Sequence, residues 1–253
     1  MPDTKNERAT NREKPQLIAD ELRALIVNGR LSEGDSLGRE PDLVERFGVS
    51  RPSLREALRI LEAEGLISVV RGALGGVVVH EPNGRMTART AALVLQSRNV
   101  PLADVDDARR LLEPMAAATI ARSARRKSAA KELAALIDQQ EAVLDDPVAF
   151  GTANARFHER IVELAGNQTL STVAEMLNEI VSRAVTAMAE TAPQEQSSRT
   201  LRRGIRSQRR LVELIGEGDA VAAEEHWRDH MAVVGKVLLG GQGDEVVDLI
   251  HHY

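Results

Sequence analysis

The chain contains no cysteine among its 253 residues. Without a thiol it can form no disulfide, offer no thiolate ligand to a metal ion and provide no cysteine nucleophile. This one absence excludes several structural and catalytic roles together.

Aromatic side chains are also scarce, at 2% of the chain. The complete set is Phe47, Phe150, Phe157, Trp227 and Tyr253. Proteins that hold single-stranded nucleic acid usually stack the bases on aromatic side chains. The composition therefore argues against that mode of binding.

Long apolar runs are missing as well. No segment approaches the roughly 18 uninterrupted apolar residues of a membrane-spanning helix, and residues 1–14 are polar and charged, unlike a signal peptide. We therefore expect a cytoplasmic protein with no membrane partner. Its hydrophobic content of 43% is sufficient for the core of one large or two modest domains.

The charge balance gives no sign of bulk attraction to nucleic acid, because the net charge is −5. Residues 1–80 alone carry 12 Lys and Arg against 13 Asp and Glu. Any binding to DNA must therefore depend on a local arrangement of arginines.

The pattern of apolar residues changes near residue 86. Before this point helical patterns are followed by a strand-like pair, and after it only helical patterns occur. Pro82 and Gly84 interrupt both periodicities. We predict a mainly α protein with a winged helix-turn-helix at 1–80, a linker at 81–86, an all-helical antiparallel bundle at 87–240 and a tail of unassigned role at 241–253. The predicted bundle helices span about 87–97, 102–123, 129–144, 148–165, 169–190, 201–216 and 220–239.

The first 80 residues show the spacing of a helix-turn-helix. A helix that ends near residue 28 is followed by a short one at about 40–47, and Gly48 suits the positive φ of a tight turn. Ser50 is a good N-cap for a third helix through about residue 63. Two β-branched runs, 66–70 and 77–79, then predict a β-hairpin wing.

The third helix has an apolar side and a basic side. Arg51, Arg55 and Arg59 step along one flank, where guanidinium groups can reach guanine edges or phosphates, and Ser50 can bond a phosphate oxygen. The alternative is an exposed helix whose arginines pair with Glu56 and Glu62. The preceding turn and the glycine-rich wing favour DNA binding.

Residues 39–58, followed by 61–67 and 71–79, resemble the winged-helix domain of the GntR family of regulators. The resemblance implies contacts to the major groove and phosphates from Ser50, Arg51 and Arg55, and a wing tip near the minor groove. Pro41 stands where the family often has a DNA-contacting arginine. The predicted DNA-binding set is Arg39, Ser50, Arg51, Ser53, Arg55, Arg71 and Gly72.

The helical half resembles the FCD-type domain of the FadR subgroup at 106–114, 156–167, 218–220 and 230–231. In many members one Asp and three His hold a divalent metal at the bundle centre, and the metal or nearby arginines bind an organic acid. In this chain His158 and His230 match two of those ligands. Asn154 stands in place of the Asp, and Gln208 stands in place of the middle His.

Amide oxygens are weak ligands for zinc-like ions, so these two changes weaken a zinc site built on His158 and His230. His226, four residues before His230, is spaced to join them. The preferred prediction is a metal-free effector pocket formed by Arg109, Asn154, His158, Gln208 and His230. In this pocket Arg109 attracts a carboxylate, or alternatively forms a structural pair with Glu113.

The sequence therefore predicts a homodimeric regulator that binds double-stranded operator DNA, a repressor released by a small organic acid or acyl compound. Two alternatives remain: a metal-dependent regulator that uses His158 and His230 with His226 or Gln208, and a helical interaction module without sequence-specific DNA binding. No nucleophile elbow, phosphate-binding loop or His-Glu-x-x-His motif is present, so we expect no enzyme.

Overall fold

The computed structural model describes residues 4–70, 75–191, 198–239 and 246. They divide into two compact units, residues 1–86 and 87–253. The tail predicted at 241–253 lies outside the described residues except for Val246.

The first unit has three helices and a small antiparallel sheet with the strand order β1-β3-β2. Its core is formed by apolar side chains from every element, with Leu22, Leu43, Leu54 and Val79 almost completely buried. This is the predicted winged helix-turn-helix. Its elements are α1 (Thr4–Val27), β1 (Ser36–Gly38), α2 (Glu40–Phe47), α3 (Arg51–Ala63), β2 (Ile67–Val70) and β3 (Gly76–Val79).

Strand β1 is an addition to the predicted two-stranded wing. It pairs with β3 through Ser36 opposite Val78 and Gly38 opposite Val77. Three residues are too few to show an alternating pattern, so the pairing exists only because the fold brings β1 beside β3. A Cβ on Gly76 would lie 3.1 Å from the Gly38 carbonyl oxygen, which explains the glycine at the start of β3.

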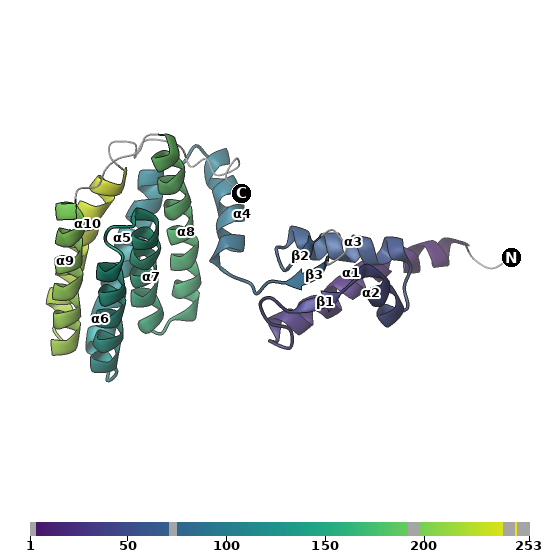
Figure 1. Cartoon of the computed structure of the whole chain (residues 1–253), viewed down its shortest axis with the longest axis horizontal. Helices are drawn as coiled ribbons and strands as arrows, with labels where there is room; N and C mark the ends of the chain where they lie inside the picture. The colour runs from purple at the N-terminus through teal and green to yellow at the C-terminus, as the bar shows by residue number, and fades with distance from the viewer. Residues whose placement is uncertain (1–3, 71–74, 192–197, 240–245, 247–253) are drawn as a thin grey trace. The chain divides into compact units, whose positions relative to one another are not determined.

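The second unit is the predicted all-helical bundle, and Figure 1 shows its helices packed side by side. Helix α5 packs against α7, α8, α9 and α10, whereas α6 packs against α7 and α9. Trp227 and Phe157 are fully buried in the larger of its two apolar clusters. The helices are α4 (Gly84–Ser97), α5 (Leu102–Arg122), α6 (Arg126–Ala142), α7 (Pro147–Leu164), α8 (Gln168–Thr191), α9 (Ser198–Glu217) and α10 (Ala220–Leu239).

Helix α4 begins at Gly84, inside the predicted linker and three residues before the predicted helix start. The proline that precedes it, Pro82, does not prevent this start because proline disturbs a helix only from within. None of the described helices is both long and apolar enough to cross a membrane.

Candidate DNA-binding face and effector pocket

The turn between α2 and α3 has the predicted geometry. Gly48 has a φ of 59°, in the left-handed region that favours glycine. Ser50 has extended backbone angles, and its Oγ accepts a hydrogen bond from the Ser53 backbone N–H at 3.3 Å. This cap fixes the start of α3 and places Arg51 in its first turn.

Three arginines line one exposed flank of α3, beside the stripe of buried side chains of the same helix. Arg51 has no hydrogen bond or ion pair with any described residue. Arg59 Nη1 lies 3.5 Å from Glu56 Oε2, and both side chains are more than half exposed. Glu62, the other carboxylate considered as a partner, instead accepts a hydrogen bond from the Val69 backbone. The basic flank is therefore largely available to a ligand.

Arg55 forms an ion pair with Glu40, a residue that was not predicted from the sequence. Its Nε lies 2.9 and 3.0 Å from the two carboxylate oxygens of Glu40, at the start of α2. This ion pair engages the Nε, and the Arg55 side chain remains 64% exposed. Glu40 therefore orients the Arg55 side chain. The two terminal nitrogens of Arg55 remain available to a guanine edge or a phosphate.

The other predicted DNA contacts divide into three cases. Ser53 is only 7% exposed and its hydroxyl lies 2.9 Å from that of Ser50, so the structure assigns it to the cap and not to the DNA-facing surface. Arg39 is exposed at the start of α2. Arg71 and Gly72 lie outside the described residues.

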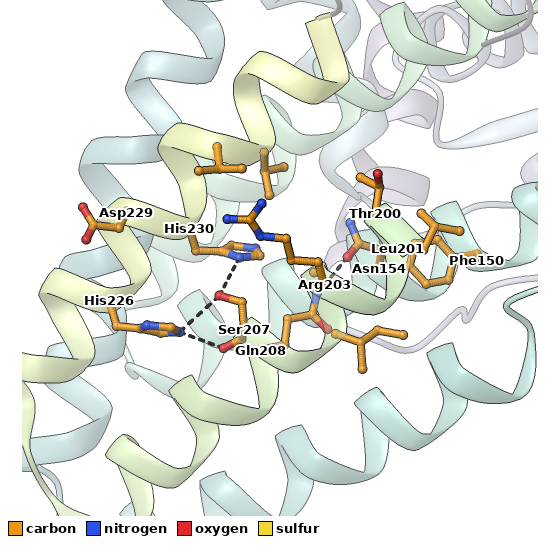
Figure 2. A pocket seen from close by; sticks show the side chains of 14 residues that line it. Phe150, Asn154, Thr200, Leu201, Arg203, Ser207, Gln208, His226, Asp229 and His230 are labelled. Atoms are coloured by element: carbon orange, nitrogen blue, oxygen red, sulfur yellow. Dashed lines mark hydrogen bonds between the residues drawn. The ribbon is translucent and has the colours of Figure 1, made fainter. Parts of the chain in front are cut away.

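The second unit contains a pocket of about 380 Å³ among α7, α9 and α10. Figure 2 shows Asn154, Ser207, Gln208 and His230 around it, with Arg203 on the same lining. Apolar side chains make up much of the remaining wall, as expected for a small-molecule site. The lining residues are Phe150, Asn154, Thr200, Leu201, Arg203, Gly204, Ile205, Ser207, Gln208, His226, Asp229, His230, Val233 and Val234.

Hydrogen bonds in the pocket fix the proton positions on its histidines. His226 Nε2 lies 2.8 Å from the Ser207 carbonyl oxygen, so this nitrogen must donate. The Ser207 hydroxyl, 2.9 Å from His230 Nδ1, then has His230 as its acceptor. We therefore assign the proton of the neutral His230 ring to Nε2, with the Ser207 hydroxyl as donor to Nδ1. Burial lowers the pKa of His230 to about 3, so the ring is neutral at physiological pH.

Two buried atoms of the pocket residues remain without partners among the residues described. Gln208 donates through Nε2 to Asn154 Oδ1 at 2.9 Å, which leaves its Oε1 as an unpaired acceptor. His230 Nε2, which carries the proton, is an unpaired donor. An unsatisfied buried polar group costs about 1–3 kcal/mol, so a partner for either atom would stabilise the protein.

His158 does not line the pocket. Its Nδ1 lies 2.6 Å from Glu113 Oε2, and this oxygen also accepts from Trp227 Nε1 at 3.1 Å. Burial raises the pKa of Glu113, but His158, Arg109 and Trp227 together hold it below its usual value. His158 therefore belongs to a buried polar network behind the pocket, with its ring 6.1 Å from that of His230.

Arg109 also belongs to this network, which corrects the prediction that it attracts a carboxylate in the pocket. It is 6% exposed and donates to Glu113 at 3.3 Å, Asp106 at 3.4 Å and Asn178 at 2.6 Å. The structural pair with Glu113, the alternative considered, is what the molecule contains. The arginine that lines the pocket is Arg203, five residues before Gln208 on α9.

The four positions that match the family's metal ligands do not fit a zinc ion. Asn154 and Gln208 bond each other, whereas His158 Nδ1 and His230 Nδ1 are engaged with Glu113 and Ser207. Within the described ranges, no three His, Asp or Glu side chains are grouped to hold a metal. His226 uses its Nε2 to bond a backbone carbonyl. These side chains act as hydrogen-bond donors and acceptors within the protein.

Family comparison decides the class of protein. The model for bacterial regulatory proteins of the gntR family matches residues 15–79, and the FCD domain model matches residues 104–233. The chain belongs to the GntR family and carries an FCD domain. It is therefore a DNA-binding transcription regulator and not an enzyme.

Named relatives of this GntR-family regulator align over most of its length. The regulator LutR of Bacillus subtilis is 26% identical over 85% of this chain and 97% of its own. The galactonate operon repressor of Escherichia coli is 27% identical over 84% of this chain and 91% of its own. A solved structure, GntR of Streptococcus agalactiae, covers 88% of this chain and 99% of its own at a TM-score of 0.60 and 21% identity, which supports the fold alone.

Several lining residues escaped the sequence-based prediction, among them Arg203, Ser207 and Asp229. These three lie close to predicted residues in the chain. Arg203 and Ser207 lie about one turn from Gln208 or directly beside it on α9, and Asp229 precedes His230 on α10. Extending the face of Gln208 by one turn reaches Gly204 and not Arg203, so the helical pattern alone did not point to this arginine.

Proposed function

We propose that this regulator is a homodimeric repressor. Its affinity for operator DNA is lowered by a small hydroxylated organic acid that binds in the pocket without a metal ion. The observation that carries the proposal is the pair of unpaired buried atoms, Gln208 Oε1 and His230 Nε2. They require a hydrogen-bond donor and an acceptor from the same ligand.

A hydroxy acid supplies both groups. Its hydroxyl can donate to Gln208 Oε1, its oxygens can accept from His230 Nε2, and its carboxylate can pair with Arg203. One relative is a galactonate operon repressor, and galactonate is itself a hydroxylated acid. This relation supports the ligand class and the assignment as a repressor.

The length of α3 supports the proposed homodimer. A single 13-residue recognition helix reads too few base pairs for useful specificity, and helix-turn-helix regulators overcome this by binding two half-sites as dimers. An acid that binds more tightly to the DNA-free protein than to the operator complex would then release the repressor.

The test is release of operator DNA from the full-length protein by a panel of hydroxy acids, in the presence of EDTA. We expect at least one acid to release the wild-type protein. Gln208→Leu should weaken its apparent affinity about tenfold, because the loss of one buried hydrogen-bonding group costs roughly 1–2 kcal/mol.

Gln140→Leu is the matched control. Gln140 is also fully buried, with both amide atoms unpaired within the described residues, but it lies on α6 and does not line the pocket. Its replacement should change the release by less than about twofold. Release that disappears with EDTA, or that is equally insensitive to both glutamine variants, would contradict the proposal.

A gain of metal binding gives a separate prediction. The double change Asn154→Asp and Gln208→His places a carboxylate and an imidazole where the family has them. We expect zinc affinity to rise at least about a hundredfold over wild type by calorimetric titration, because anionic and imidazole ligands replace neutral amides. Tight zinc binding by the unaltered protein, or no gain in the double variant, would contradict this prediction.

A further inference from the structure

Helix α9 carries six arginines and no lysine. Four of them, Arg199, Arg202, Arg203 and Arg206, are exposed and recur at intervals of three and four residues. At 100° per residue they share one side of the helix, which we call the arginine face. This concentration stands out in a chain whose net charge is −5.

The arginine face differs from the rest of the helix in its partners. Arg209 pairs with Glu141 at 2.7 Å and Asp138 at 2.9 Å, and Arg210 pairs with Glu213 at 2.9 Å. The four members of the arginine face have no hydrogen bond or ion pair with any residue in the described ranges. Like charges one turn apart repel, so an unpaired group of this kind is more stable with an anion bound to it.

The arginine face adjoins the effector pocket. Arg203 is both a member of the face and a lining residue, and it lies one turn before the pocket residue Ser207. Figure 2 shows Arg203 among the side chains that surround the pocket. A carboxylate paired with Arg203 leaves Arg199, Arg202 and Arg206 without an anion. The pocket and the face together therefore suit a ligand with more than one negative charge.

We infer that the arginine face binds the phosphoryl group of a phosphorylated small molecule whose organic part occupies the pocket. The planar guanidinium fork matches phosphate oxygens in a bidentate manner, and the exclusive use of arginine agrees with this chemistry. The inference rests on the proposed function, since it extends the same effector site outward along α9. It narrows the effector class to phosphate esters of hydroxylated acids and related compounds.

The test uses inorganic pyrophosphate as the probe and the full-length protein, by calorimetric titration at fixed ionic strength. The triple variant Arg199→Gln, Arg202→Gln, Arg206→Gln removes the three members of the arginine face that do not line the pocket. We expect pyrophosphate to bind the triple variant at least about tenfold more weakly than wild type. Arg210→Gln, on the same helix but paired with Glu213, is the control and should change the affinity by less than about twofold.

Two results would overturn the inference. The first is wild-type protein that does not bind pyrophosphate at about 10 mM, or whose binding weakens equally in the Arg210→Gln control. The second is a triple variant that binds pyrophosphate as the wild type does but whose operator affinity depends less on salt. The slope of log affinity against log salt concentration would then be smaller by about 0.9 for each DNA phosphate that is no longer neutralised. The second result would assign the arginines to DNA.

The same measurements separate this inference from the proposed function. In one outcome a hydroxy acid releases the operator and Gln208→Leu weakens that release, but pyrophosphate does not bind. The pocket is then an effector site as proposed, and the inference about the arginine face is wrong. If pyrophosphate binds at the arginine face but no acid or phosphorylated acid releases the operator, the proposed function fails instead.

Discussion

Alanine at both Arg51 and Arg55 is expected to abolish sequence-selective retention of operator DNA. Each arginine that contacts a base edge through two hydrogen bonds contributes about 1–3 kcal/mol of discrimination, and a dimer carries two copies of each. Both side chains are exposed on one side of α3, whose start is fixed by the Ser50 cap. A loss of at least about a hundredfold in operator affinity follows, measured by fluorescence anisotropy at a stated salt concentration.

Arg30→Ala is the control for that loss. Arg30 is an exposed arginine of the same unit that lies outside α3. It should change operator affinity by less than about threefold, since one exposed charge adds little. A double variant at Arg51 and Arg55 that still selects operator over unrelated DNA would show that α3 is not the reading element.

Glu113→Ala is expected to destabilise the helical unit by about 3–5 kcal/mol, because it removes one partner of a buried ion pair. Glu113 accepts hydrogen bonds from His158, Trp227 and Arg109, and the residue is 1% exposed. The change removes the partner of His158 Nδ1 and Trp227 Nε1 in the core, whereas Arg109 keeps Asp106 and Asn178. Urea unfolding followed by the fluorescence of Trp227, the sole tryptophan, reports on this unit.

Glu213→Ala is the matched control, because its carboxylate is 61% exposed in a surface pair with Arg210. This change should lower the free energy of unfolding by no more than about 0.5 kcal/mol.

The contribution of Glu113 to stability also depends on pH, because the folded state lowers the pKa of this carboxyl. The contribution is present above the ordinary carboxyl pKa and is lost as the pH falls through the pKa of Glu113 in the folded state. A destabilisation below about 1 kcal/mol in Glu113→Ala would mean that the buried network adds little to the fold.

Local sequence signals predicted most of the fold. The apolar periodicity of α3 and the bundle helices, the glycine at position 48 and the N-cap at Ser50 are properties of neighbouring residues, and the structure has all of them. Strand β1 was missed because its pairing with β3 joins segments about forty residues apart. A three-residue strand has no pattern of its own.

The candidate site was predicted less completely, because its roles depend on partners distant in the sequence. Arg109 was expected in the pocket, but Asn178, 69 residues away, and Glu113 engage it in the core. Glu40 and Arg55 are 15 residues apart and meet only through the helix-turn-helix. The hydrogen bond of Asn154 with Gln208 likewise joins residues 54 positions apart on α7 and α9, which no local pattern shows.

We expect an effector in the pocket to lower the affinity of the protein for operator DNA, and operator DNA to lower the affinity for the effector. The most direct test measures a hydroxy acid, found by operator release, binding to the free protein and to the operator complex by calorimetry in EDTA. We expect the acid to bind the free protein more tightly by the same factor by which it weakens operator binding, since linkage is reciprocal. Equal affinity of the acid for the free and the operator-bound protein would contradict this coupling.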